Sequence, residues 1–383
     1  MRFSASRREF LGVTLAAPVV GVPAGRVSWE AAQESQPEME YRALGSTGVK
    51  VTALGFGCML TSDPSVIERA VDVGINYFDT ARGYQRGNNE RMVGAALKPV
   101  RSKVILGTKS GAATAEGLRA DLETSLRELG TDYIDIWYLH SKDSISQVSD
   151  ELLEVMARAK EEGKIRFAGV STHSGQKALL PALAENPQID VILTAYNFTM
   201  DEEMKQAVAT ARRSGKGIVA MKVMAGGFRR AGGESPLRDK LQRPGAFVAA
   251  LKWVLKDPNV DTAIPSITDM QQLEENLSAL REPFSGRDEE LLAGQLEAIR
   301  PFYCRMCGEC SGRCPGGVPV QEVLRILTYA EGYGQFPLAR ERYLELEQQV
   351  QVGLCDLCPE CRVVCPHGIQ VAERMRKARE LLA

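Results

Sequence analysis

The sequence has no excess of charge of either sign. It contains 47 Lys and Arg residues against 49 Asp and Glu residues, for a formal net charge of −2, and 44% of its 383 residues are apolar. A protein that binds nucleic acid through electrostatics has a basic surplus, and a disordered chain has fewer apolar residues. Both classes are therefore disfavoured, and no nucleic-acid partner is expected. The length suits one large domain with a small one, or two or three domains of ordinary size.

A long hydrophobic run is also missing. The apolar stretch from Phe10 to Val22 is too short for a stable membrane span. It follows a basic segment and precedes small residues that end at Ala24, which is the order found in a signal peptide. We therefore predict an export signal over residues 1–24 and a linker over residues 25–38. A disordered basic tail is the alternative.

The segment SRREFLG, residues 6–12, resembles the twin-arginine export signal in its paired Arg7 and Arg8 and in Phe10 and Leu11. This resemblance implies recognition by the twin-arginine export machinery, which carries proteins that are already folded. It also implies a periplasmic location. The alternative is that the signal is inefficient and the protein works in the cytoplasm.

The first predicted βα turn lacks the G-x-G-x-x-G fingerprint of dinucleotide-binding open sheets. Short apolar runs nevertheless alternate with amphipathic stretches, as in repeated βα units. Eight strands are predicted: TALGFG (52–57), INYFD (75–79), KVILGT (103–108), YIDIWYL (133–139), FAGVS (167–171), DVILTAY (190–196), GIVAMKV (217–223) and TAIP (262–265). This number favours a (β/α)8 TIM barrel over a doubly wound sheet. We predict the barrel over residues 39–285 and a connecting helix over residues 286–300.

Four polar residues lie at or just beyond predicted strand ends. Asp79 ends the second strand, Tyr84 follows it, Lys109 ends the third strand and His140 ends the fourth. Catalytic groups of such barrels gather at the carboxyl ends of the strands. A lysine held by a carboxylate lowers the pKa of a nearby phenol, so the four can form a proton relay with Tyr84 as the donor. Taken singly, each has a structural alternative as a cap, an ion-pair partner or a core histidine.

Several blocks of the chain resemble the aldo/keto reductase family in the family's order. They span about residues 39–280: YRALGSTGVKVTALGFG, INYFDTARGY, NERMVGAAL, VILGTKS, TSLRELGTDYIDIWYLH, GKIRFAGVS and AIPSITDMQQLEENL. The resemblance implies a TIM barrel that moves a hydride between NAD or NADP and a carbonyl or alcohol. It implies Tyr84 as the acid/base, Asp79 and Lys109 as the groups that tune it, and His140 as the group that orients the substrate oxygen.

The same resemblance implies a set of cofactor-binding residues. They are Ser171 at the carboxamide, Asn197 beside the nicotinamide ring, Met221 and Lys222 at the ring face, and Glu275 and Asn276 at the adenine. Met221 replaces a common aromatic residue, and its alternative reading is a core strand residue. Leu193 replaces a common glutamine. Ser266 and Gln272 stand where a Lys and an Arg often hold a 2′-phosphate, which weakens the case for NADP.

Cysteine is nearly absent from the first 303 residues, where Cys58 is predicted to be a buried pocket-wall residue and not a nucleophile. The other eight cysteines form two CxxCxxCxxxCP motifs in residues 301–383: Cys304, Cys307, Cys310 and Cys314, then Cys355, Cys358, Cys361 and Cys365. This spacing is typical of [4Fe-4S] ligands, and two such clusters are predicted. Zinc fits poorly, because its sites usually show two close pairs with a longer spacer. Four disulfides are the rival in an exported protein.

Two amphipathic stretches, residues 320–332 and 338–350, lie between the cysteine motifs. The tail therefore resembles the mainly helical, ferredoxin-like domains that bind two clusters. This resemblance implies crossed ligation, in two quartets: Cys304, Cys307, Cys310 and Cys365, and Cys355, Cys358, Cys361 and Cys314.

Together these features predict an exported oxidoreductase that combines a nicotinamide-dependent barrel with an electron-transferring tail. Its expected partners are a small carbonyl or alcohol substrate and a redox protein. The sequence has no second fingerprint for a flavin that would divide an electron pair. The alternative function is an electron-transfer or ligand-binding module whose barrel is not a nicotinamide-dependent catalyst.

Overall fold

The computed structural model describes residues 38–227, 241, 243–346, 355, 358 and 360–383. The predicted export signal lies outside these residues. The signal and the linker that follows it therefore stay predictions. Among the described residues, no helix is both long and apolar enough to cross a membrane.

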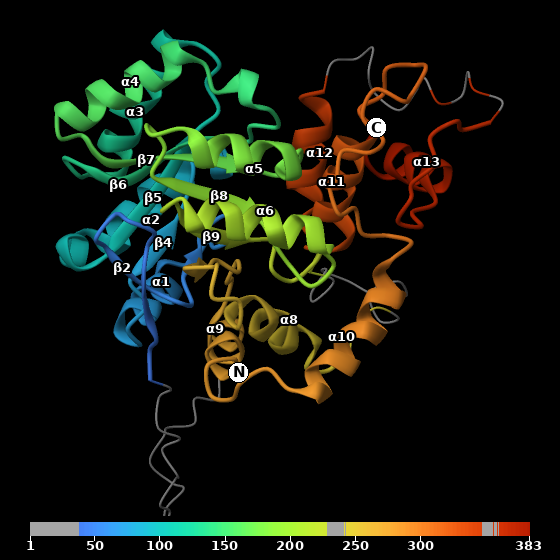
Figure 1. Cartoon of the computed structure of the whole chain (residues 1–383), viewed down its shortest axis with the longest axis horizontal. Coiled ribbons are helices and arrows are strands. Elements are labelled where there is room, and N and C mark those ends of the chain that lie inside the picture. The colour runs from blue at the N-terminus through green and yellow to red at the C-terminus, as the bar shows by residue number, and fades with distance from the viewer. Residues whose placement is uncertain (1–37, 228–240, 242, 347–354, 356–357, 359) are drawn as a thin grey trace, which may run out of the picture. The chain divides into compact units, whose positions relative to one another are not determined.

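Eight parallel strands form a nearly closed barrel at the centre of the described chain (Figure 1). The strands are β3 (Phe56–Gly57), β4 (Tyr77–Asp79), β5 (Ile105–Ser110), β6 (Ile134–Leu139), β7 (Ile165–Thr172), β8 (Val191–Ala195), β9 (Gly217–Met221) and β10 (Thr262–Ala263). Each strand pairs with the next, and isolated bridges Leu54–Ala263 and Gly57–Ser266 bring β3 against β10. The predicted (β/α)8 barrel is confirmed, and the doubly wound alternative is wrong.

The first predicted strand divides into two parts. Its first residue, Thr52, belongs to a separate antiparallel hairpin of β1 (Tyr41–Ala43) and β2 (Lys50–Thr52), while the last two residues form β3. The hairpin places Leu44 and Val51 against the inner apolar cluster at the amino-terminal ends of the strands. Gly45 makes the turn with φ +52°, and a Cβ atom there would lie 2.3 Å from the backbone nitrogen of Gly217. The hairpin therefore closes the end of the barrel opposite the strand carboxyl ends.

Helices connect the strands and cover the barrel. They are α1 (Pro64–Asp72), α2 (Asn88–Leu97), α3 (Ala115–Leu129), α4 (Asp150–Glu161), α5 (Gln176–Glu185), α6 (Glu202–Arg213), α8 (Ala246–Leu255) and α9 (Met270–Ser278), with short 3₁₀ helices η1 (Tyr84–Gly87), η2 (Lys98–Lys103) and η3 (Ile145–Gln147). Helix α3 illustrates the local causes. Thr114 caps it by accepting from the Gly117 N–H, and Gly130 ends it with φ +61°. Leu118 and Leu122 lie one turn apart on its buried face.

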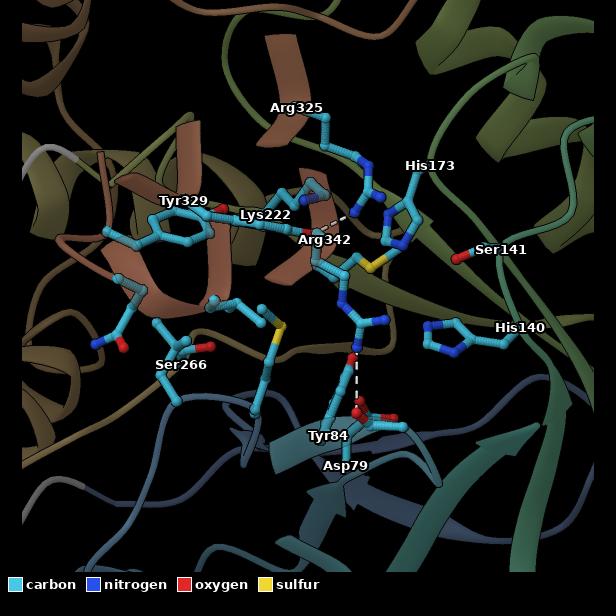
Figure 2. A pocket seen from close by; sticks show the side chains of 18 of the residues that line it. Asp79, Tyr84, His140, Ser141, His173, Lys222, Ser266, Arg325, Tyr329 and Arg342 are labelled. Atoms are coloured by element: carbon cyan, nitrogen blue, oxygen red, sulfur yellow. Dashed lines mark hydrogen bonds between the residues drawn. The ribbon is translucent and has the colours of Figure 1, made fainter. Parts of the chain in front are cut away.

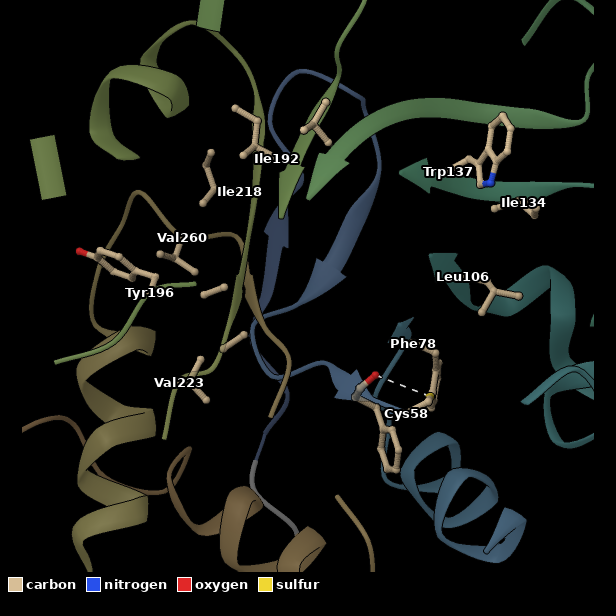
Figure 3. Close-up of a cluster of buried hydrophobic side chains, with 14 of the residues drawn as sticks. Cys58, Phe78, Leu106, Ile134, Trp137, Ile192, Tyr196, Ile218, Val223 and Val260 are labelled. Carbon is tan, nitrogen blue, oxygen red and sulfur yellow. Dashed lines mark hydrogen bonds between the residues drawn. The ribbon is translucent and has the colours of Figure 1, made fainter. Parts of the chain in front are cut away.

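The main apolar core lies between the strands and these helices (Figure 3). Cys58 is fully buried in this core, beside Phe78. Burial and the nearby Asp79 carboxylate raise the pKa of the Cys58 thiol far above its ordinary value. Cys58 is thus buried as predicted, and its thiol is unsuited to act as a nucleophile.

The tail continues from the barrel as α10 (Gly286–Ile299), α11 (Val320–Glu331), α12 (Phe336–Leu344) and α13 (Val371–Leu382). Helix α10 lies within the predicted connecting segment, and α11 and α12 coincide with most of the two amphipathic stretches, although α12 ends at Leu344 and residues 347–350 lie outside the described residues. Helices α11, α12 and α13 pack on one another around a second apolar core, which also contacts Met59 and Met200 of the barrel. The described barrel and tail belong to one compact unit, and the predicted boundary between them stays a prediction.

The tail docks on loops at the carboxyl ends of the strands. A Cβ atom on Gly332, after α11, would lie 1.9 Å from the carbonyl oxygen of Gly226 in the loop after β9. Only glycine permits this contact of backbone with backbone. Arg86 pairs with Glu341 at 2.7 Å, and Arg342 Nη2 donates to the Gly83 carbonyl at 3.1 Å. Barrel and tail therefore share an interface at the end where the predicted site lies.

Candidate active site

The four predicted catalytic residues come together. Lys109, in β5, donates from Nζ to Asp79 Oδ1 at the end of β4 and to the Thr80 carbonyl at 2.6 Å. The ammonium lies 5.1 Å from the centre of the Tyr84 ring, and the rings of Tyr84 and His140 are 6.0 Å apart between centroids. Strand ends that meet at one rim of the barrel account for this convergence.

Burial decides the protonation of Tyr84. It raises the pKa of this phenol, and the opposing effect of the Lys109 ammonium is smaller. The predicted influence of the lysine is therefore present, but the expectation of a net lower pKa is wrong. Burial also acts to lower the pKa of Lys109, but Asp79 and Tyr84 outweigh it and the pKa is raised. Tyr84 is thus a protonated phenol at neutral pH beside a charged ammonium, as a proton donor requires.

The imidazole of His140 is neutral at neutral pH. Burial and the charge of Lys109 hold its pKa well below the ordinary value. A neutral imidazole can present an N–H to an oxygen atom, and it does so without competing for the proton of Tyr84. This state suits the predicted role of His140 in orienting a substrate oxygen.

A cavity of about 1280 Å³ opens over these residues. A single small ligand usually occupies about 300–1,000 Å³, so the cavity has room for a cofactor and a substrate together. Barrel residues such as Asp79, Tyr84 and His140 line one side, and residues of α11 and α12 line another. The site is therefore a composite of barrel and tail.

Sequence reasoning did not single out four cavity residues: His173, Arg325, Tyr329 and Arg342. Figure 2 shows the side chains of Arg325, Tyr329 and Arg342 around the same space as Tyr84 and His140. Arg325 and Tyr329 lie four positions apart on α11, so they share one face of that helix. Their four-residue spacing within an amphipathic stretch was the one feature of the sequence that could have pointed to them.

Ser171, Asn197 and Met221 of the predicted nicotinamide site are buried, and Lys222 is partly buried. Ser171 Oγ accepts from the Ser141 N–H at 2.9 Å. Asn197 donates from Nδ2 to the Lys222 carbonyl and to the Tyr303 hydroxyl, both at 3.0 Å, so the protein itself uses both of its N–H groups. Met221 and Lys222, at the end of β9, line the cavity. Leu193, which stands in place of a glutamine common in the family, lies in the inner barrel core.

The predicted adenine site contains a buried group without a partner. Asn276, in α9, is 1% exposed, and its Nδ2 has no hydrogen-bond partner among the described residues. A buried amide donor usually has a partner, so this one fits a ligand such as an adenine nitrogen. Glu275 precedes it in the same helix and is partly buried. Gln272 and Ser266 line the cavity nearby, and Gln272 Nε2 donates to Asp269 at 3.1 Å.

The tail cysteines are all described and all free. Burial raises the pKa of Cys304 to about 12, and negative charge at Cys310, Cys307 and Cys365 adds to the effect. The pKa values of Cys307 and Cys310 are likewise raised by burial and by Cys365. The Met306 N–H donates to Cys304 Sγ at 3.3 Å. These four thiols therefore lie within electrostatic range of one another.

The second predicted quartet is less closely defined. Cys314, Cys355 and Cys361 pack at the edge of the tail core, as does Cys365 of the first quartet. Among the residues that the structure describes, no group of three or more His, Cys, Asp or Glu side chains is arranged to hold a metal ion. The cluster assignment therefore stays a prediction for both quartets.

Comparisons with known proteins bear on the barrel. The model of the aldo/keto reductase family matches residues 61–245. The chain is 30% identical to L-galactose dehydrogenase of Arabidopsis thaliana over 303 residues, which cover 68% of this chain and 94% of the relative. It is 30% identical to probable aldo-keto reductase 1 of Glycine max, over 66% of this chain and 88% of that protein.

A solved structure agrees. The holo form of an aldo-keto reductase from Bacillus halodurans superposes with a TM-score of 0.57 at 28% identity, over 67% of this chain and 96% of that one. The Arabidopsis match leaves 100 − 68 = 32% of this chain without a counterpart in that relative. With its barrel, its cavity and its four converging strand-end residues, this chain belongs to the aldo/keto reductase family and is an NAD(P)-dependent oxidoreductase.

Proposed function

We propose that Tyr84 is the acid/base of a reaction that interconverts a carbonyl compound and its alcohol. Its position beside Lys109 and His140, at the floor of the cavity, carries the proposal. When bound, the nicotinamide supplies or accepts the hydride. In the reducing direction, the hydroxyl of Tyr84 gives its proton to the substrate oxygen. His140 orients that oxygen through an N–H, and Lys109, held by Asp79, stabilises the phenolate that remains.

Barrel residues would hold the cofactor at two places. Asn276 would donate to the adenine through its unpartnered Nδ2, and Met221 would cover one face of the nicotinamide ring. Ser171 Oγ accepts from the Ser141 N–H and donates to no group in the part of the chain that the structure describes, so its own hydrogen is free for the carboxamide. The cofactor contacts therefore come from β7, β9 and α9.

Replacement of Tyr84 by phenylalanine tests this assignment. We expect Tyr84→Phe to abolish reduction of an aromatic aldehyde such as 4-carboxybenzaldehyde, measured as loss of NADH absorbance. Binding of NADH, measured by quenching of protein fluorescence, should be unchanged. Full activity in this variant would refute the acid/base role. If the wild-type protein does not bind NADH, the alternative function is favoured, in which the barrel is a ligand-binding module.

We also infer that NAD(H) is the preferred cofactor. Ser266 and Gln272 carry no charge to pair with a 2′-phosphate, and the Asp269 carboxylate accepts from Gln272 in the same corner. These two side chains would therefore give a 2′-phosphate no charge pairing. We expect kcat/KM to be higher with NADH than with NADPH, and Gln272→Arg to raise the value for NADPH. A preference of the wild type for NADPH would contradict this inference.

We further propose that the tail holds two [4Fe-4S] clusters that exchange electrons with a redox protein. The motif spacing and the mutual proximity of Cys304, Cys307, Cys310 and Cys365 support the first cluster. Thiolates are the ligands of such clusters, and the N–H donated to Cys304 is the kind of bond that tunes their potential. The second quartet repeats the spacing with Cys314 as the ligand contributed by the first motif.

Iron analysis of anaerobically purified full-length protein tests the clusters. We expect about eight iron atoms per chain, and about half as many in Cys307→Ser or in Cys358→Ser. Cys58→Ser is the control, because this cysteine lies in the barrel core and should leave the iron content unchanged. Zinc in place of iron, or iron content unaffected by either variant, would refute the assignment. Electron paramagnetic resonance with NADH and with dithionite then tells whether nicotinamide reduces the clusters.

Export through the twin-arginine pathway is a proposal that rests on residues 1–24 alone. That pathway carries folded proteins, which is consistent with a protein loaded with clusters before it leaves the cytoplasm. We expect a cleaved form in the periplasmic fraction of the source cell, and Arg7→Lys with Arg8→Lys to retain it inside. An uncleaved chain confined to the cytoplasm would contradict export.

A further inference from the structure

We propose that the substrate carries a carboxylate, and that His173, Lys222 and Arg325 bind it in a carboxylate subsite formed jointly by barrel and tail. The proposal rests on the function proposed above, because it places this subsite beside the carbonyl that Tyr84 and His140 hold. It extends that function by naming the class of substrate: oxo acids and the corresponding hydroxy acids.

Lys222 supplies a positive charge at the cavity wall. It follows β9 directly, and its backbone has φ +56°, a left-handed conformation that is costly for a residue with a side chain. Among the described residues, no carboxylate lies within ion-pair distance of its ammonium. The ammonium instead lies 5.5 Å from the centre of the Tyr329 ring. A strained backbone that turns an unneutralised ammonium toward a cavity fits a residue that binds an anionic ligand.

Arg325 supplies the second cation from the tail. Its Nε donates to Glu322 at 2.8 Å, its Nη2 donates to the other oxygen of Glu322, and its Nη1 donates to the Tyr329 hydroxyl. A guanidinium has five N–H groups, so one remains on each Nη atom. The side chain is 17% exposed, and it lines the cavity. Glu322 and Tyr329 therefore fix the guanidinium, and it keeps two N–H groups that can reach an anion in the cavity.

His173 links the subsite to the reacting group. Its ring centroid lies 6.2 Å from that of His140, which is 6.0 Å from Tyr84. Its Nδ1 is buried without a hydrogen-bond partner among the described residues. Burial and the charges of Lys222 and Arg325 hold its pKa well below the ordinary value, so the ring is neutral. In the tautomer with hydrogen on Nδ1, this ring donates to a carboxylate that the two cations attract.

The charges around the two imidazoles favour an anion. After burial, the largest influences on the pKa of His140 come from Lys109, Arg325, Arg342 and Lys142, and all four are cationic. Arg325 and Arg342 have glutamate partners, whereas Lys222 has none among the described residues. The Glu322 carboxylate lies within electrostatic range of Lys222 but is already held by Arg325, so a neutral ligand would leave the Lys222 ammonium without a direct counter-ion among the described residues. A carboxylate a few bonds from the reacting carbonyl would compensate it.

A matched pair of substrates tests the proposal with the full-length protein. The probes are 4-carboxybenzaldehyde and its methyl ester, which share the reacting aldehyde and differ in charge. We expect the wild type to prefer the acid, and Lys222→Met to lower the ratio of kcat/KM for the acid to kcat/KM for the ester by about tenfold or more. Lys222→Arg should restore part of this preference. Arg86→Gln, which removes an exposed cation from the interface between barrel and tail, is the control variant.

Equal losses with acid and ester in Lys222→Met and Arg325→Gln would overturn the subsite, because a merely structural role does not distinguish the two substrates. No preference of the wild type for the acid would overturn it as well. Weaker NADH binding in Lys222→Met, with acid preference intact, would show that the lysine serves the phosphates of the cofactor, and it would also overturn the proposal.

Calorimetric titration with benzoate and with benzamide separates this proposal from the proposed function, because it needs no turnover. We expect benzoate to bind more tightly than benzamide, and Lys222→Met to remove the difference. If benzoate binds in this manner while Tyr84→Phe retains activity, the acid/base assignment fails and the subsite stands. If Tyr84→Phe is inactive and benzoate binds no better than benzamide, the subsite fails and the assignment stands.

Discussion

The barrel and the tail each bring a tyrosine to the same cavity, where a barrel lysine lies near each ring, and the two tyrosine–lysine pairs differ in their charge balance. Lys109 lies 5.1 Å from the Tyr84 ring, and Lys222 lies 5.5 Å from the Tyr329 ring. Lys109 is held by the Asp79 carboxylate, whereas Arg325 adds a second cation beside Tyr329. The lysine is therefore almost equally close to the ring in both pairs, but the charges around the two pairs differ.

The pKa values of the two phenols diverge accordingly. Burial acts to raise both of them. For Tyr84 burial prevails, so its pKa is raised, whereas for Tyr329 the charges of Arg325 and Lys222 outweigh burial and its pKa is lowered. A lysine held by a carboxylate thus leaves Tyr84 protonated, whereas two cations, one of them held by Glu322, make Tyr329 more acidic. The Tyr84 pair suits proton transfer, and the Tyr329 pair suits binding of an anion.

Loss of the barrel lysine should have the largest effect. Lys109→Met leaves the Asp79 carboxylate buried without its partner, and breaking a buried ion pair in this way costs about 3–5 kcal/mol of unfolding free energy. Activity should be lost together with this stability. Chemical denaturation and NADH oxidation measure the two effects.

Lys222→Met is the matched control for stability, because no described carboxylate lies within ion-pair distance of Lys222. If both variants lose the same free energy of unfolding, the two lysines are equivalent and the contrast between the pairs is wrong.

Titration of the tyrosines should separate the two phenols. We expect one phenol to lose its proton below the usual pKa of 10.0, seen as early tyrosinate absorbance in the ultraviolet, and Tyr329→Phe to remove this component. Lys222→Met should move it to higher pH, because one of the two cations that stabilise the phenolate is gone. In Tyr84→Phe the early component should persist. If the early component disappears in Tyr84→Phe, it belongs to Tyr84 and its assignment to Tyr329 is wrong.

The imidazoles between the two pairs should make stability depend on pH. The pKa values of His140 and His173 are lowered in the folded protein, so on acidification from about pH 6.5 the unfolded chain binds protons that the folded chain does not. The free energy of unfolding should therefore fall as the pH falls below that value, by up to about 1.4 kcal/mol per pH unit for each histidine. His173→Asn should reduce the slope measured by denaturation at several pH values. An unchanged slope would mean that His173 is already solvated.

The smallest effect is expected at the rim of the interface between barrel and tail. The side chain of Arg86 is 79% exposed, and it pairs with Glu341 in solvent, where screening removes most of the attraction. Arg86→Ala should leave kcat, KM and the thermal midpoint within experimental error. A clear loss would show that the tail is held on the barrel by surface charge, not by the shared apolar core and the backbone contact of Gly332.

The sequence predicted the barrel well because its strands are short apolar runs with regular spacing. All eight are present, although β3 retains only Phe56 and Gly57 of its predicted span. Thr52 belongs to the hairpin because the apolar residues of the hairpin pack against the inner core. This tertiary packing leaves no periodic pattern in the sequence from which the hairpin could be predicted. Strand-end positions predicted Asp79, Tyr84, Lys109 and His140 together, since the topology of a barrel alone brings them to one rim.

The tail side of the cavity was not predictable in the same manner. Arg325 and Tyr329 are far from Tyr84 in the sequence, and their approach depends on how α11 docks on the barrel. Their polar face on an amphipathic helix is also typical of a solvated surface. Likewise, the spacing of cysteines predicts ligands but not which quartets form, because crossed ligation depends on the path of the chain between the motifs.

The contact of α11 with the barrel mouth has a consequence for inheritance and engineering. Since the tail contributes a wall of the substrate cavity, a change of tail would change substrate choice while the hydride chemistry of the barrel stayed the same. A barrel without its tail would therefore not keep the same specificity, because one wall of its cavity would be missing. Recombination between related genes at the barrel–tail junction would thus change substrate specificity in a single event.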